Sequence, residues 1–176
     1  MAEAITSYWN LVEPVFASID FTDSECFAAS TAGVPREVVL LYATHFCLSE
    51  VHNGGFLQFF WNSTGLIAPE VVDGFVALGM PQMAALVRTA AAALGSPYPR
   101  DRDSRWDALL QASGRSQRDL KKIFKKNENL YLAFAEATEP LSYDAMNRHA
   151  WDLARSENGG FQEAATRYAR SFSKIQ

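Results

Sequence analysis

The stretch that decides the fold is residues 35–65, PREVVLLYATHFCLSEVHNGGFLQFFWNSTG. Apolar side chains recur there at every third or fourth position, which is the period of an α-helix and not of a strand. The run opens at Pro35, a residue suited to the first turn of a helix, and is interrupted by Asn-Gly-Gly at 53–55. We therefore predict two helices separated by a sharp corner, the first over residues 35–52 and the second over 56–65.

The same helical period continues through most of the 176 residues, and the alternation typical of strands is nearly absent. A stripe from Ile5 to Ile19 is interrupted by Pro14, where we expect a kink or a break. Asp23 is the expected N-cap of a short helix that ends near Gly33. Further helices are expected over residues 69–79, 81–95 and 103–114, from 116 onward, and twice after 141, with Asp103 and Ser116 as N-caps. The sequence therefore predicts an all-α fold, a single helical domain over residues 1–176 built as a bundle of about eight or nine helices.

The composition fits a folded protein of a reducing compartment. Apolar residues make up 48% of the chain and charged residues 20%, which excludes a disordered chain. Cys26 and Cys47 form no paired framework, as expected where thiols stay reduced. The N-terminus lacks the positively charged start of a signal peptide, and the apolar stretch 38–48 is too short to span a bilayer. We therefore expect a cytoplasmic protein without membrane contact.

The charges are unevenly distributed along the chain. Residues 1–87 hold nine acids and one base, a net of −8, whereas residues 88–126 have a net of +6 and residues 127–176 a net of −2. Acids spaced three or four residues apart on a helix lie close together, and others cluster in a short loop. These residues form a candidate acidic face for a protein partner: Asp20, Asp23, Glu25, Glu70 and Asp73. An ordinary solvated acidic surface is the alternative interpretation.

The basic stretch 115–126 is predicted to be an amphipathic helix. Leu120, Ile123 and Phe124 occupy one side of the helical projection. The opposite arc is cationic and consists of Arg118, Lys121, Lys122, Lys125 and Lys126. Such an arc is a candidate phosphate-binding surface, with a solvated face as the alternative. The overall net charge of −4 argues against general nucleic-acid binding.

The sequence Asn-Gly-Gly-Phe occurs twice, at residues 53–56 and 158–161. Each copy ends one helical stripe and starts another, so we predict a helix stop in which Asn or Gly takes positive φ. The second glycine lets the chain turn back closely, and the phenylalanine anchors the new helix in the core. Because the flanking residues match poorly, reuse of the same cap chemistry is favoured over duplication.

Polar residues surround the first copy. Gln58 and Asn62 share one helix face amid aromatic residues, and Glu50 precedes the corner. We expect these side chains to hydrogen-bond loop backbone at a buried corner, with a binding role as the alternative. The candidate corner residues, mainly structural, are Glu50, Asn53, Gly54, Gly55, Phe56, Gln58 and Asn62.

Residues 50–65 resemble the signature of a bacterial family of DNA-mimic proteins, a helical domain of formerly unknown function. The likeness continues through Ala77-Leu78-Gly79-Met80 and through residues 97–106, and it covers roughly residues 35–135. The parts of the chain outside it are then N- and C-terminal helical extensions. The resemblance implies an all-α, often dimeric protein with no known catalysis. It also implies a DNA-binding protein as the partner, because at least one kind of member presents carboxylates in place of DNA phosphates.

Motifs for catalysis or metal binding are missing from the sequence, including Gly-x-Ser-x-Gly, the P-loop and His-Glu-x-x-His. His45 and His52 share a helix face but lie about 10 Å apart along its axis, too far to hold one metal ion. We therefore predict no enzyme activity, no metal and no cofactor. The favoured function is a protein-interaction module that mimics DNA and occupies a DNA-binding or regulatory protein. The alternative is a nucleic-acid or phosphate binder that uses the basic stretch 115–126.

Overall fold

The computed structural model describes residues 5–172, and within that range it contains helices and turns but no strand. The all-α prediction is therefore confirmed. The α-helices are α1 (Trp9–Val12), α2 (Ser24–Thr31), α3 (Arg36–Trp61), α4 (Ala68–Ala77), α5 (Pro81–Ala91), α6 (Arg102–Ala112), α7 (Gln117–Lys126), α8 (Leu130–Thr138), α9 (Asp144–Ser156) and α10 (Phe161–Phe172). Short 3₁₀ turns are η1 (Glu13–Val15), η2 (Ser63–Ile67), η3 (Ala92–Leu94), η4 (Glu139–Leu141) and η5 (Glu157–Gly159).

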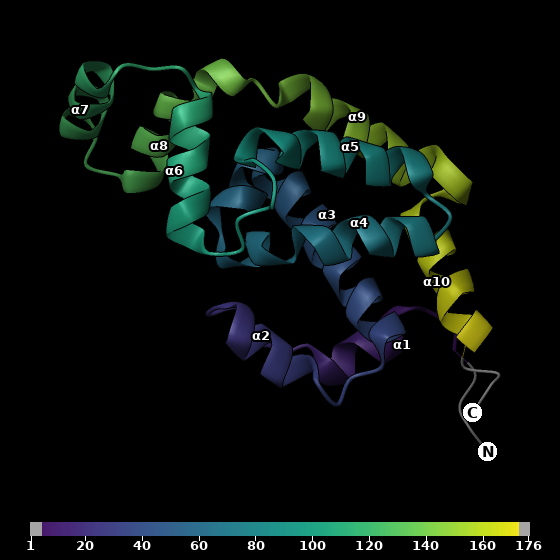
Figure 1. Cartoon of the computed structure of the whole chain (residues 1–176). Helices are drawn as coiled ribbons and strands as arrows, with labels where there is room; N and C mark the ends of the chain where they lie inside the picture. Colours follow the sequence, from purple (N-terminus) through teal and green to yellow (C-terminus); the bar gives the residue numbers. More distant parts are fainter. Residues whose placement is uncertain (1–4, 173–176) are drawn as a thin grey trace.

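Helix α3 forms the centre of the molecule, and α1, α4, α6, α9 and α10 all pack against it (Figure 1). Its residues are apolar around almost the whole circumference, which is the pattern of a helix enclosed by neighbours. Leu41, Phe59 and Phe60 are fully buried. They belong to one continuous core that also includes Phe75 of α4 and Phe161 of α10.

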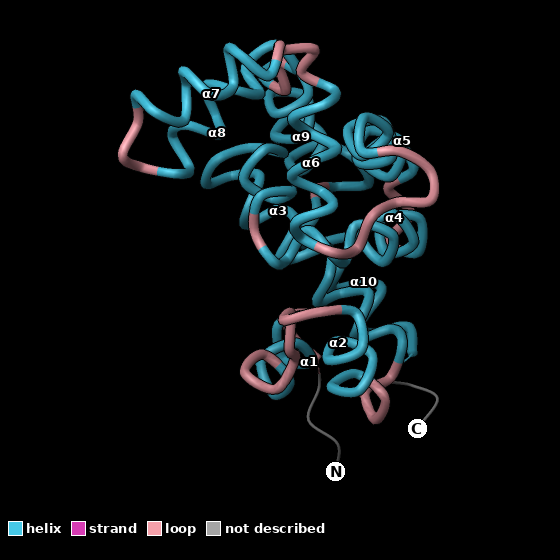
Figure 2. Tube along the Cα trace, turned by 60° about the vertical axis from the view of Figure 1, so that its left-hand side comes forward, coloured by secondary structure: helices cyan, strands magenta, loops and turns pink. Residues whose placement is uncertain are grey.

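Helices α7 and α8 form a small hairpin with its own apolar cluster of Leu120, Ile123, Ala133 and Ala137. Figures 1 and 2 show this hairpin at one end of the molecule, with α1 and α2 at the other end. The hairpin is attached through α6 and through Phe134 of α8, whose ring centroid lies 4.6 Å from that of Trp61 at the end of α3. The acidic residues 20–25 and the basic helix α7 therefore lie far apart in space as well as in sequence.

Several helix boundaries differ from the sequence prediction. The two helices predicted over residues 35–65 are present within α3, where the non-helical angles of Gly54 and Gly55 separate them, but the second ends at Trp61 and not at Gly65. The segment before α2 holds only the four-residue α1, because Pro14 follows at once in the turn η1. The sequence analysis also missed α8, so ten α-helices are seen in the described range, close to the expected number.

The predicted N-caps are right for two helices and wrong for one. Asp23 accepts a hydrogen bond from the Cys26 amide of α2, and Ser116 accepts one from the Asp119 amide of α7. The N-cap of α6 is Asp101, not Asp103, because the backbone is still extended at Asp101 and already helical two residues later. Among the helices of residues 5–172, none combines the length and apolar character that a membrane span requires.

Candidate functional site

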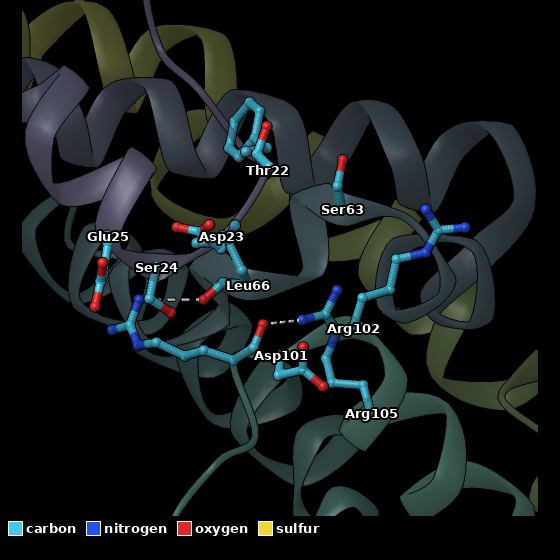
Figure 3. A pocket seen from close by; sticks show the side chains of 11 residues that line it. Thr22, Asp23, Ser24, Glu25, Ser63, Leu66, Asp101, Arg102 and Arg105 are labelled. Carbon is cyan, nitrogen blue, oxygen red and sulfur yellow. Dashed lines mark hydrogen bonds between the residues drawn. The ribbon is translucent and has the colours of Figure 1, made fainter.

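A cleft of about 330 Å³ lies where the start of α2 faces the start of α6 (Figure 3). Acidic, basic and hydroxyl side chains line it together. The polar lining residues are Thr22, Asp23, Ser24, Glu25, Ser63, Arg100, Asp101, Arg102 and Arg105. Two members of the predicted acidic face, Asp23 and Glu25, are thus brought to one site with Asp101, a carboxylate that the sequence analysis did not select.

The carboxylates at this cleft are held in place by backbone amides. Asp23 accepts from the Cys26 amide at 2.8 Å, and Asp101 accepts from the Ser104 amide at 2.8 Å. Nearby, Asp20 accepts from the Thr22 amide at 2.7 Å. The side chain and amide of Thr22 lower the pKa of Asp20, and the amide hydrogen bonds lower the pKa of Asp23 and Asp101, so each carboxyl stays ionised well below neutral pH. Asp20, Asp23 and Asp101 are therefore exposed carboxylates whose orientations are fixed by hydrogen bonds.

The arginines of the cleft mostly contact other groups of the protein. The Arg105 side chain is fully buried, and its guanidinium donates to the carbonyl oxygens of Phe60, Asn62 and Arg100. Desolvation lowers its pKa, yet an arginine stays charged at any physiological pH. Arg102 lies over the Trp106 ring, 4.5 Å from its centroid. Arg105 is thus a structural cation that ties the end of α3 to α6, for which the sequence gives no visible signal.

The predicted acids of α4 are neutralised by ion pairs. Glu70, whose side chain is 15% exposed, accepts two hydrogen bonds from Arg100, at 2.8 and 3.0 Å. Asp73 is more exposed and pairs with Arg36 at 2.7 Å. Bidentate pairing leaves Glu70 little charge to offer a partner. Of the five predicted acids, Asp20, Asp23 and Glu25 form the part of the face that has no ion-pair partner within residues 5–172.

Glu50 is the centre of the polar network at the first Asn-Gly-Gly-Phe corner. Its carboxylate accepts from the side chains of Gln58 at 2.7 Å, Asn62 at 2.9 Å and Thr64 at 3.0 Å. The expectation that these side chains bind loop backbone was wrong, because the helix brings Gln58 and Asn62 under Glu50 on one face. With all three donors directed at one carboxylate, the network is a brace inside the corner.

A second contact fixes the backbone of the corner itself. The Phe56 amide donates to the Asn147 side-chain oxygen of α9 at 2.9 Å, and Phe56 is fully buried. Gly55 has φ 77° and ψ −175°, which confirms the predicted positive φ. Asn53 itself is exposed and keeps helical angles. These contacts assign the corner residues to structure.

The basic arc of α7 is exposed, as the amphipathic pattern predicted. Lys122 lies 3.7 Å from Asp119, and Lys126 lies 3.6 Å from Glu136. Arg118, Lys121 and Lys125 have no ion-pair partner in the part of the chain that the structure describes. On the other face, Leu120 and Ile123 are buried against α8.

His45 and His52, the histidines that share one face of α3, do not belong to a group of side chains suited to bind a metal within residues 5–172. His45 lies within hydrogen-bond distance of the Tyr8 hydroxyl, with Nδ1 at 2.9 Å. Across residues 5–172, no three His, Cys, Asp or Glu side chains gather as metal ligands would.

Residues 32–151 match the model of a family described as DMP19-like protein. No curated protein and no solved structure matches the chain. The matched segment contains the first corner, the cleft side formed by α6 and the basic helix α7. It excludes α1, α2 and α10, so Asp20, Asp23 and Glu25 lie outside it.

Proposed function

Because this chain belongs to the DMP19-like protein family, we propose that it is a DNA mimic, a non-enzymatic protein that occupies a DNA-binding or regulatory protein. The partner would meet carboxylates where it normally meets phosphates. Such a mimic requires anions that are fixed in position, since a partner built for DNA recognises a regular array of charge.

The anchored carboxylates at the α2–α6 cleft are the observation that carries this proposal. Asp23 and Asp101 each use a hydrogen bond from a helix-terminal amide to hold a defined orientation. Glu25 lines the same cleft, and Asp20 is fixed just before it. Because hydrogen bonds already hold these side chains in place without a partner, binding would cost little side-chain entropy.

The proposed binding face is narrower than the sequence suggested. Ion pairs remove Glu70 and Asp73 from it, while Asp101 is added. The face then consists of Asp20, Asp23, Glu25 and Asp101. The cytoplasm, where DNA-binding partners and reduced thiols such as Cys26 and Cys47 occur together, is the proposed location.

The experiment is a capture of DNA-binding proteins from the source cell by the immobilised chain, followed by elution with duplex DNA. The wild type should hold a partner that duplex DNA displaces, and added salt should weaken the complex. The combined variant Asp20→Asn, Asp23→Asn, Glu25→Gln and Asp101→Asn should lose that partner. Asparagine caps a helix as well as aspartate does, so the variant keeps its fold.

The control changes the net charge equally at exposed acids elsewhere, with Glu128→Gln, Asp144→Asn, Asp152→Asn and Glu163→Gln. It should retain the partner. Tight binding of duplex DNA by the wild type at physiological salt would favour the phosphate-binding alternative and exclude the mimic. A partner that stays bound after the loss of all four carboxylates of the proposed face would also overturn the proposal.

A further inference from the structure

A groove of about 470 Å³ is lined by residues of α6 and α7 and by Arg115 between them. Figures 1 and 2 show α7 at the end of the molecule away from α2. Apolar side chains form much of its lining. Leu110 and Phe124 are half-buried, and Leu120 is 8% exposed. Covering such apolar surface with a partner is favourable by about 25 cal/mol per Å². The groove thus offers apolar contact on a part of the protein that the proposed function does not use.

Cations flank this groove along one side. Lys121 lines it, and Arg118 and Lys125 lie beside Lys121 on the exposed face of α7. None of these three has an ion-pair partner among residues 5–172. Arg115 at the groove is already bonded to two carbonyl oxygens of α8, and Asp107 is the acid on the α6 wall. A groove that contains two half-buried apolar side chains, Leu110 and Phe124, therefore runs beside a strip of three available positive charges.

We propose that this groove docks an acidic amphipathic helix of a partner protein. Leucine-like side chains of that helix, spaced at i, i+4 and i+7, would cover the half-buried Leu110 and Phe124. Its carboxylates would face Lys121, Arg118 and Lys125. A nucleic-acid backbone would use the same cations but would leave Leu110 and Phe124 uncovered, so the observations favour the protein segment.

The test uses a fluorescent synthetic peptide of about 15 residues, long enough for four helical turns. The peptide carries leucine at i, i+4 and i+7 and glutamate on the flanking positions. Measured by anisotropy, it should bind at least about tenfold more tightly than a peptide of equal charge with serine for leucine, a difference of about 1.4 kcal/mol. It should also bind more tightly than single-stranded and duplex oligonucleotides of similar length.

Lys121→Glu should weaken peptide binding at least about tenfold, because it replaces a cation that lines the groove with an anion. Arg148→Glu on α9 makes the same charge change at an exposed site and should leave binding unchanged. Both positions are exposed, so both variants should fold, which circular dichroism checks. Amide shifts in nuclear magnetic resonance should locate the bound peptide at Leu110, Gln111 and Lys121.

Three results would overturn this assignment. Equal binding of the serine peptide would mean that charge alone is recognised. Tighter binding of an oligonucleotide would make α7 a phosphate site. Absence of peptide binding, or shifts outside the groove, would show that the groove has no such ligand. The acids of the α2–α6 cleft are intact in these variants, so the outcome is independent of the proposed DNA mimicry.

Discussion

The two Asn-Gly-Gly-Phe corners share four residues but differ in backbone and in what they hold. In both copies the second glycine lies in a region of φ and ψ that is essentially reserved for glycine, with Gly55 at 77° and −175° and Gly160 at 90° and 156°. The preceding residues differ. Gly54 has φ −154°, whereas Asn158 and Gly159 both have positive φ. The motif thus determines the conformation of the second glycine in both corners, whereas the surrounding structure determines the conformation of the residues before it.

The first corner is held mostly by side chains of α3 and of the segment that directly follows it. Glu50 gathers the side chains of Gln58, Asn62 and Thr64, and Asn147 of α9 accepts from the Phe56 amide. These partners are mainly flexible amides and a hydroxyl. The corner therefore bends α3 and braces the bend from inside.

The second corner fastens two other helices together. The buried carboxylate of Glu157 accepts from the amides of Gln82 and Met83 at 2.7 and 2.9 Å, which caps the start of α5. Asn158 donates to the Leu78 carbonyl at 2.8 Å, at the end of α4. This corner therefore joins the α9–α10 turn to the α4–α5 turn, a contact that its sequence does not predict.

The largest effects are expected at the second glycines. Gly55→Ala should lower the free energy of unfolding by about 3 kcal/mol. An alanine is strained at this φ and ψ, and its Cβ would also meet the Asn147 side chain. Gly160→Ala should cost about 2 kcal/mol, since its Cβ would lie 3.0 Å from the Arg155 carbonyl oxygen. Gly33→Ala is the control and should cost less than about 1 kcal/mol, because no heavy atom lies within 4 Å of the added Cβ and the φ of Gly33 is not positive. Urea denaturation measures all three, and equal costs for Gly33→Ala and Gly55→Ala would refute the conformation shared by the second glycines.

A medium effect should separate the two glutamates. Glu157→Gln should cost about 2 kcal/mol, because one of two backbone amides loses its acceptor and neither amide can turn. Glu50→Gln should cost about 1 kcal/mol, since the amide of Gln58 can flip to present its oxygen. Thermal melting of the two isosteric variants side by side provides the measurement. The reverse order would contradict the distinction between a fastening corner and a braced one.

The smallest effect is the coupling between Gly55 and Asn147. Asn147→Ala alone should cost about 1 kcal/mol through the lost acceptor for the Phe56 amide. Because it also removes the group that a Cβ at Gly55 would meet, the double variant with Gly55→Ala should be about 1 kcal/mol more stable than the sum of the single losses. Gly160→Ala with Asn147→Ala, at the other end of α9, should be additive. Coupling in that second cycle would count against two separate corners.

The sequence by itself determined the helical fold and most helix ends. Helical stripes, the caps Asp23 and Ser116 and the glycine stops are local patterns that propensity and turn chemistry fix within a few residues. The N-cap at Asp101 was misplaced because Asp103, two residues later, fits the same pattern. Helix α8 was missed, and two of its exposed residues, Leu130 and Leu132, are themselves apolar.

Only the tertiary structure decided which charges are available to a partner. Glu70 and Asp73 have the spacing of an exposed acidic face, yet Arg100 and Arg36, distant in the sequence, pair with them. Asp101 joins Asp23 at one cleft only because the starts of α2 and α6 meet in space. Residue spacing reports neighbours along one helix, whereas an ion pair or a shared cleft depends on how different helices pack. The charge of a residue was therefore known from the sequence, and its availability from the fold.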